Sequence, residues 1–539
     1  STFKLNSYVI FDRKNNTEEQ ISKQTYFASD ENFVLNLNNS SENTFLINNT
    51  FINASFKPTN RSVLEYNLNF SPQDSDLIGL DDLEIQRFTA HRNNRSYALN
   101  QVLNYKHKFT NYLFSSSIYH SLKERDDELL LSSDQGFLGF TFPDNDYSAF
   151  QRIHNFKSSY GVNANLSRPL TKHTSLRISY NLTKNQETFQ SDSNANMLSN
   201  NSEMDVLENQ LGIRLYNKSR VFLNYEMGSF YSILNTNEIT NHAILPFASL
   251  KFNFKKTHAL SFSYKRTLQL PLAENIIDDA YIANFNTLLS NDNITSSMLS
   301  KFDNFSFLYF LYDLFSGTLL SLGGNLIFGN NVVATNTENF SNTILNSYRL
   351  ADVNENINFY LLLDKKFTKI PFKLRLKNTL TLIEQNNFIS DFEYATQSRI
   401  LSNGLHLYSN FRSSFFNFEM GYNRRQNLIE SSSINISSKV VTHEPFLNVL
   451  FNFRRLDFRI NGAIEFFNSE VSQQRFYRIA PTLDYKSANK KWTFYIKGVD
   501  ILNMRSNSII ENRVFENYVE ERNVAILGGF AIAGFKLKF

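Results

Sequence analysis

Apolar and polar residues alternate strictly in many short runs along this chain. The run at 160–167 shows the pattern, with apolar side chains at every second position: Tyr160, Val162, Ala164 and Leu166. The residues between them are Gly, Asn, Asn and Ser. Similar runs occupy 63–70, 175–183, 247–255, 373–383, 415–423, 457–466 and 492–498. Because successive side chains of a strand point to opposite faces, each run predicts a β-strand with one apolar and one polar face.

A soluble β-sandwich would give the same local pattern. Three features favour strands that cross a membrane instead. The runs are about ten residues long, Tyr and Phe recur near their ends, and the connections alternate between short and long. Backbone groups cannot stay unpaired in lipid, so spanning strands must close into a barrel. The sequence therefore predicts an all-β fold, a transmembrane antiparallel β-barrel with short periplasmic turns and long extracellular loops.

The connections allow the strands to be counted. Short turns are expected near 57–62, 106–111, 167–175, 216–220, 254–258, 313–317, 364–372, 410–414, 453–456 and 486–491. Long loops are expected near 38–43, 71–95, 123–157, 184–205, 231–245, 268–303, 331–352, 384–401, 424–444, 467–474 and 504–524. This alternation predicts about 22 strands, and any even count from about 20 to 24 is compatible with it.

Residues 1–23 do not fit this count. We interpret them as a linker, as the tail of an upstream plug-like domain, or as a strand whose direction the count misassigns, and we assign 24–539 to the barrel. The chain starts at Ser1 without a signal peptide, so we expect an upstream segment that includes one.

Composition excludes several classes of protein. Aromatic residues make up 15% of the chain, with 52 Phe and 26 Tyr. An AT-rich genome would raise the Asn, Phe and Tyr content, but it would not place the aromatics near strand ends. The net charge is +3 with basic residues spread along the chain, which does not indicate nucleic-acid binding. The absence of Cys excludes disulfides, thiolate metal sites and a Cys nucleophile.

The C-terminal residues form one more alternating run. Phe535, Leu537 and Phe539 share one face, and Lys536 and Lys538 share the other. A last strand that alternates and ends in Phe resembles the C-terminal signal recognised by the outer-membrane barrel assembly machinery. We therefore expect this machinery to be a partner during biogenesis.

Three stretches resemble a known family. The sequence LPFASL at 245–250 is followed by LSFSYKRTLQLP at 260–271, and WTFYIKGVDILN occupies 492–503. These stretches resemble the barrel of TonB-dependent receptors in their Bacteroidetes form, and Tyr264, Lys265 and Arg266 match best. The family's usual LNPF and GNP-x-L-x-PE motifs are not recognisable in 268–312.

The resemblance implies a barrel of 22 strands in the outer membrane of a Gram-negative cell, filled by an N-terminal plug. External loops of the family bind a nutrient such as a metal chelate, a glycan or a peptide, and TonB pulls on the plug. The implied partners are outer-membrane lipid and lipopolysaccharide, TonB through an upstream plug, and a surface lipoprotein or other complex subunits. No plug or TonB box occurs in this sequence, so two alternatives stay open: a structural or accessory barrel subunit of a larger complex, and an unplugged channel.

No local motif indicates an enzyme. The nine His form no H-x-x-H pair, and no G-x-S-x-G, Walker A or dinucleotide motif is present. We therefore assign no catalytic residue, cofactor or metal ligand. Acidic groups such as Asp126, Asp127 and Glu128 suit a divalent cation or a basic ligand, and they equally suit an ordinary solvated loop.

Aromatic residues gather in one expected external loop. The segment 134–150 carries Phe137, Phe140, Phe142, Tyr147 and Phe150 around a single Pro. Exposed aromatics would stack on sugars or contact a partner protein. The alternative is that they fold back onto the barrel rim. These five residues are the candidate contacts for a ligand or partner.

Overall fold

The computed structural model describes residues 2–26, 33–83, 86–134, 148–194, 198–217, 222–237, 239–254, 257–284, 286–340, 343–352, 354–409, 411, 415–431, 436–469, 473–488, 491–501, 508–514, 518–525 and 529–537. The first eleven strands are β1 (Thr2–Tyr26), β2 (Phe33–Thr59), β3 (Ser62–Leu83), β4 (Gln86–Lys108), β5 (Leu113–Ser133), β6 (Ser148–Pro169), β7 (Thr174–Ser193), β8 (Asn200–Asn217), β9 (Leu223–Asn235), β10 (Thr240–Phe254) and β11 (His258–Gln269).

The remaining elements follow in chain order. They are η3 (Ala273–Asn275), β12 (Tyr281–Asn284), β13 (Thr287–Asn291), β14 (Ser300–Asp313), β15 (Thr318–Asn330), β16 (Val332–Phe340), β17 (Thr343–Ala351), β18 (Asn354–Lys366), β19 (Phe372–Ile389), β20 (Phe392–Ser409), β21 (Phe416–Ser431), β22 (Ile436–Phe453), β23 (Leu456–Ser469), β24 (Gln473–Lys486), β25 (Trp492–Val499), β26 (Ser508–Val514), β27 (Tyr518–Ala525) and β28 (Phe530–Leu537). Within the described ranges, no helix combines the length and apolar character needed to cross a membrane.

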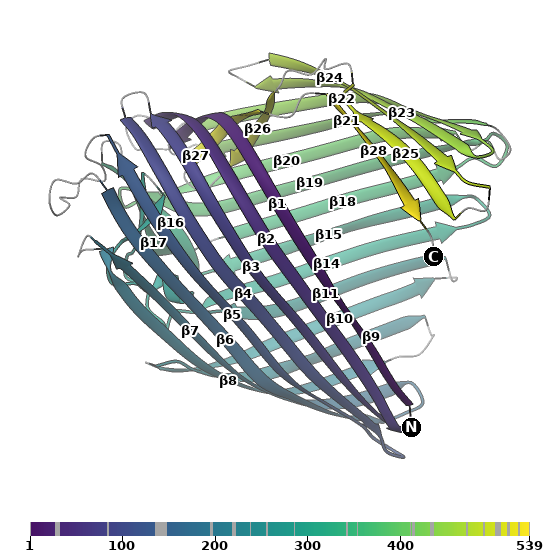
Figure 1. Ribbon diagram of the computed structural model, residues 1–539. Helices are drawn as coiled ribbons and strands as arrows, with labels where there is room; N and C mark the ends of the chain where they lie inside the picture. The colour runs from purple at the N-terminus through teal and green to yellow at the C-terminus, as the bar shows by residue number, and fades with distance from the viewer. Residues whose placement is uncertain are drawn as a thin grey trace.

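One curved antiparallel sheet forms the wall of the molecule. Its neighbours run from β1 through β11, then β14, β15, β18 through β25, and β28. Figure 1 shows this wall curling round, so that the first strands face the middle strands across an interior. The prediction of an all-β, antiparallel fold is therefore confirmed.

The predicted count of 22 strands is not confirmed. Among the described residues the hydrogen-bonded sheet contains 28 strands, because connections between wall strands add strands of their own. Among the described residues, β28 pairs with β25 and β1 pairs with β2 and β27, and no pair joins β1 to β28. Closure of the wall into a barrel stays a prediction.

The short turns lie where the alternation predicts them. A short connection joins the paired strands that end and begin at Thr59 and Ser62, at Asp313 and Thr318, and at Phe453 and Leu456. The turn after Asp313 uses Gly317, whose φ of 63° is a left-handed conformation that glycine adopts without a steric penalty. A Cβ there would also lie 2.6 Å from the carbonyl oxygen of Lys366.

The expected long loops are largely strands. Residues 38–43 lie inside β2, and most of 71–95 belongs to β3 and β4, which pair from Ser62 with His107 to Leu83 with Gln86. The expected strand length of about ten residues is also wrong here, since β1 has 25 residues and β2 has 27. The backbone groups of polar residues still form hydrogen bonds between strands. The position where the alternation of apolar residues stops is therefore the end of the apolar surface, and the strand continues beyond it.

Residues 2–23 belong to β1 and pair with β2 along their length. These residues thus form a strand of the wall, which corresponds to the third alternative given for 1–23. The division of the chain into 1–23 and a barrel at 24–539 stays a prediction.

The two faces of the wall differ in character. Cross-strand pairing sets Leu166, Ile178 and Ile213 in one row, and all three side chains are exposed. The adjacent positions Asn163 and Asn181 pair on the opposite face, which lines the interior. The wall thus presents apolar side chains outward and polar side chains inward.

Candidate functional site

Two connections fold back into the interior and form a second layer, which we name the cap. It consists of residues 270–299, which carry η3, β12 and β13, together with the hairpin of β16 and β17. β13 pairs with β12 on one side and in parallel with β17 on the other, from Thr287 with Ile344 to Asn291 with Tyr348. The cap lies towards the end of the wall opposite the short turns (Figure 1).

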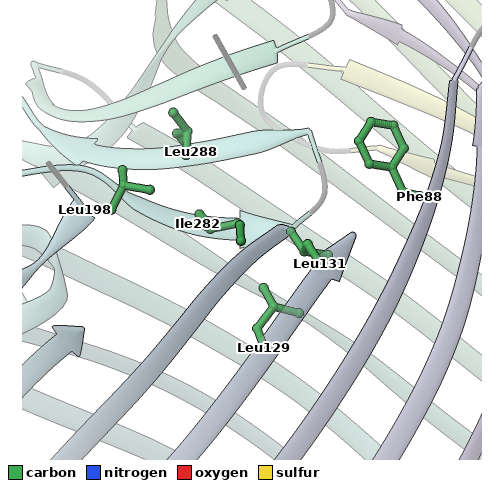
Figure 2. Close-up of a cluster of buried hydrophobic side chains, with 7 residues drawn as sticks. Phe88, Leu129, Leu131, Leu198, Ile282 and Leu288 are labelled. Carbon is green, nitrogen blue, oxygen red and sulfur yellow. The ribbon is translucent and has the colours of Figure 1, made fainter. Parts of the chain in front are cut away.

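An apolar cluster fixes the cap to the wall. Ile282 and Leu288 of the cap pack with Phe88, Leu129 and Leu131, which project from β4 and β5. Figure 2 shows these side chains gathered between the inner strands and the wall. Burying an apolar side chain of this size contributes about 1.5–3 kcal/mol, so the cluster is a substantial anchor.

A second apolar cluster holds the start of the cap. Ala273, Ile277 and Tyr281 pack with side chains from β7, β8 and β9, namely Phe189, Met204, Val206 and Leu234. Burial raises the pKa of the Tyr281 phenol above its usual range. The phenol therefore stays protonated, as an apolar setting requires.

Side chains of the wall also bind the backbone of the cap. The amide of Ile282 donates to Gln151 Oε1 at 2.7 Å, and the amide of Asp279 donates to Asn200 Oδ1 at 2.7 Å. Ser202 Oγ donates to the carbonyl oxygen of Ala273 at 2.8 Å. These bonds satisfy backbone groups that the irregular path of the cap leaves without a strand partner.

One arginine joins the cap to the far side of the wall. Arg349 of β17 binds Asp292 with its Nε at 2.8 Å and Asp391 with its Nη2 at 2.8 Å. Its guanidinium also lies 5.1 Å from the centre of the Phe388 ring. Asp292 follows β13 and Asp391 lies between β19 and β20, so this residue connects three segments.

Beneath the cap lies a cavity of about 970 Å³, the candidate functional site. Its wall side is formed by β6 to β11, and its cap side includes Leu270, Leu272 and Leu299. A volume of this size is typical of small-molecule sites.

A continuous ladder of side-chain hydrogen bonds crosses the wall of this cavity. Asn163 and Asn165 of β6 are hydrogen-bonded to each other, and Asn163 also donates to Asn181 of β7. Asn181 Nδ2 donates to Gln210 Oε1 at 3.1 Å, and Gln210 Nε2 donates to Glu208 Oε1 at 2.7 Å. Ser179 Oγ and Ser232 Oγ extend the ladder at its two ends. We call these residues the amide ladder.

The charged residues of the cavity form ion pairs. Lys157 Nζ lies 3.1 Å from Glu187 Oε2, and Arg214 Nη1 lies 2.6 Å from Glu226 Oε1. The Nε of Arg214 is buried without a hydrogen-bond partner. Phe230 and Phe247 lie beside this pair with ring centres 5.6 Å apart, and Arg214 lies 4.8 Å from the centre of the Phe247 ring.

One acidic residue of the cap lies close to this charge network. Burial raises the pKa of Glu274 above its ordinary value of 4.5, and repulsion from Glu187 raises it further, while Arg125, Lys157 and Lys123 oppose the change. The cap therefore holds a carboxyl group that favours its neutral form.

The predicted loop aromatics do not contribute to this cavity as far as it is described. Phe137, Phe140, Phe142 and Tyr147 lie outside the described residues. Phe150 lies in β6 and is 41% exposed. Its role as a ligand or partner contact stays a prediction.

The predicted assembly signal lies on the last strand. Phe535 and Leu537 belong to β28 and are 76% and 49% exposed, while Phe539 lies outside the described residues. Their outward exposure suits contact with another surface, and their recognition by the assembly machinery stays a prediction.

The acidic group at 126–128 is divided between the two faces of β5. Asp127 is 1% exposed and binds Arg92 and Arg125. Asp126 pairs with His154 at 2.7 Å, and Glu124 lies close enough that the ligand atoms of the three are within 4.8 Å of one another. Asp127 is therefore neutralised by its two arginines and does not belong to a loop.

Sequence reasoning missed the cavity, although its signal was present. The polar positions of the runs at 160–167 and 175–183 include Asn163, Asn165 and Asn181, which form most of the ladder. Alternation identified these as the polar face. It did not show that residues 270–299 fold over them, since that contact is distant in sequence.

No protein-family model matches the sequence, and no curated protein matches it. Several solved structures are similar in overall arrangement. The siderophore receptor PirA from Pseudomonas aeruginosa shares 8% identity, with 96% of this chain and 80% of that chain covered and a TM-score of 0.43. The FrpB iron transporter from Neisseria meningitidis, in its apoprotein form, shares 11% identity, with coverage of 96% and 81% and a TM-score of 0.46.

A ferric enterobactin receptor from Pseudomonas aeruginosa gives similar values. It shares 8% identity, with 95% of this chain and 81% of that chain covered and a TM-score of 0.45. The similarity to these structures is one of general arrangement.

Proposed function

We propose that this chain is the wall of an outer-membrane receptor that takes up a nutrient through its interior. The observation that carries the proposal is the combination of an apolar outer face with a polar, capped cavity on the inner face. A water-soluble sheet protein would bury the apolar face instead.

The side chains of the outer face change from apolar to charged along the strands, as expected for a protein that spans a membrane. Towards the short turns the paired row Leu166, Ile178 and Ile213 is apolar and exposed. Towards the other end, on the same face, Arg95 pairs across the sheet with Asp126, and Asp126 pairs with His154. A lipid layer would cover the apolar rows and leave the charged rows in water.

Aromatic rings gather near the short turns, where the lower membrane interface would lie. Ring contacts join Phe222, Phe252 and Phe254 on one side. On the other they join Phe372 with Phe411 and Phe418, Phe415 with Phe453, and Tyr485 with Trp492. Such girdles are typical of membrane barrels.

The interior is suited to hold a solute on its way through. The cap narrows the end opposite the short turns, and the cavity beneath it offers hydrogen-bonding groups and ion pairs. In this proposal the nutrient enters past the cap and binds in the cavity. A metal chelate, a glycan and a peptide are the classes of nutrient to be compared, and no enzymatic step is involved.

The proposed partners follow from the membrane location. Outer-membrane lipid and lipopolysaccharide would surround the apolar face, and the assembly machinery would recognise the last strand through Phe535, Leu537 and Phe539. TonB would act through an upstream plug, and a surface lipoprotein or another complex subunit would contact the cap end.

Site-directed labelling tests this orientation, because the chain contains no Cys. We place one Cys in a short turn, Ser316→Cys, and one at the opposite end, Ser390→Cys. Intact cells are treated with a membrane-impermeant maleimide. In intact cells we expect only the Ser390→Cys variant to be labelled. After lysis we expect both variants to be labelled. Equal labelling of both in intact cells, or recovery of the protein outside the outer-membrane fraction, would contradict the proposal.

A further inference from the structure

We infer that the cavity beneath the cap selects an uncharged polar solute. The inference deepens the proposed function, since it concerns the solute bound at the proposed uptake site. It rests on the balance of charge in the cavity and on the amide ladder.

The cavity presents little net charge to a ligand. Lys157 is paired with Glu187, whose side chain is 6% exposed, and Arg214 is paired with Glu226. Arg266 also borders the cavity, but its side chain lies on the face of β11 opposite Lys265 and is paired with Asp303 at 2.7 Å. The two remaining charged residues of the lining, Glu208 and Lys265, have opposite signs.

Because four of the lining charges form ion pairs with one another and the two unpaired ones, Glu208 and Lys265, have opposite signs, an ionic ligand meets no net counter-charge in the cavity. It would have to lose its hydration or displace one member of an existing pair, and either step is unfavourable in a partly buried site. An uncharged ligand with hydroxyl or amide groups avoids this cost. The cavity therefore disfavours ionic ligands relative to uncharged ligands of the same shape.

The amide ladder supplies groups that such a ligand would bind. Each Asn or Gln side chain has two N–H donors and an oxygen with two lone pairs. The bonds within the ladder use only part of that capacity at Asn163, Asn165, Asn181 and Gln210.

The apolar groups of the cavity complete the match to an uncharged solute. Phe230 and Phe247 place two adjacent rings beside the ladder, and Leu270, Leu272 and Leu299 face it from the cap. A ligand with polar groups along one edge and C–H groups along another would bury both in suitable surroundings.

The test compares three size-matched probes of different charge. These are tri-N-acetylchitotriose, which is uncharged, its de-acetylated cationic form, and trigalacturonate, which is anionic. Binding to the full-length chain in detergent is measured by saturation-transfer NMR, so that no transport is required. We expect the uncharged probe to bind at least about tenfold more tightly than either ion, a difference of about 1.4 kcal/mol.

A variant tests the role of the ion pairs directly. Glu187→Gln removes the partner of Lys157 and is expected to raise the affinity for trigalacturonate about tenfold. The matched control Glu124→Gln makes the same chemical change on the outer face of β5, two strands away from β7, and should leave all three affinities as they were.

The results separate this inference from the proposed function. Equal binding of the three probes, preferential binding of an ion, or no binding of the uncharged probe would overturn the inference while leaving the membrane orientation untouched. If the labelling experiment contradicts the expected orientation but the uncharged probe still binds most tightly, the proposed function is overturned and the inferred selectivity is retained.

Discussion

In a membrane, the free edges of β1 and β28 must pair with each other. β28 has eight residues and, among the described residues, hydrogen-bonds to β25 on one side only. β1 pairs with β27 over Gln20 to Tyr26, which leaves its earlier residues without a second neighbour in the described part of the chain. The side chains of Phe3, Leu5 and Phe11 on this edge are exposed.

An unpaired edge of β28 would be costly in lipid. About half of the N–H and C=O groups of an eight-residue edge strand point away from its one partner, which is about four groups of each kind. Leaving a polar group unpaired in an apolar medium costs about 2–7 kcal/mol, so an open β28 edge with about eight such groups would cost on the order of 16–56 kcal/mol. This exceeds the usual net stability of a domain, about 5–15 kcal/mol.

Cysteine cross-linking measures the predicted contact in a chain that has no native Cys. Ala533→Cys on β28 is combined with single Cys substitutions at each position of 3–11 on β1, and disulfide formation in outer membranes is followed by gel mobility. We expect cross-links at alternate positions with one maximum, because only side chains on the same face of paired strands approach closely.

Known neighbours provide the controls. Ile496 pairs with Ala533 across β25 and β28, so Ile496→Cys with Ala533→Cys should always cross-link. Ile178→Cys on β7 with Ala533→Cys should not. If the positive control forms and no position on β1 reacts in membranes, the reasoning about closure is refuted.

Three further results are expected. Asp127→Asn leaves Arg92 and Arg125 without their shared carboxylate, so urea denaturation should show a loss of about 3–5 kcal/mol, and wild-type stability would contradict the assigned network. Ile282→Ala opens a void in the cluster that holds the cap and should weaken docking by about 2–5 kcal/mol, seen as faster proteolysis within 270–299 but not in the wall. The pKa of Glu274 is raised on folding, so docking of the cap should be strongest below pH 4.5, the ordinary pKa of Glu, and should weaken as pH rises through the raised pKa. Proteolysis within 270–299 should therefore become faster as pH rises, and Glu274→Gln should remove this dependence on pH.

The alternation of the sequence predicted the wall because strand geometry is local. A residue such as Val162 points outward and Asn163 inward whatever the rest of the chain does, and short turns interrupt the pattern directly. The limits of the strands were predicted less well. Leu83 and Gln86 still pair although their surroundings are polar, since backbone pairing does not depend on an apolar face.

The cap could not be predicted in the same way. Its position depends on packing between residues far apart in the chain, such as Phe88 with Ile282, and on the parallel pairing of β13 with β17. The sequence marks 268–303 only as a long connection. A conserved register or a turn motif would have been needed to show that it folds inward.

The cap also bears on where an upstream plug would fit. Ile282, Leu288 and Tyr281 fill the space against the inner face of β4 to β9 at the end opposite the short turns, and two segments cannot occupy the same volume. A plug that entered this wall would therefore have to leave the volume of the cap free. The amide ladder lies beneath that cap, so a solute bound to the ladder would be covered by the cap whether or not a plug enters the wall.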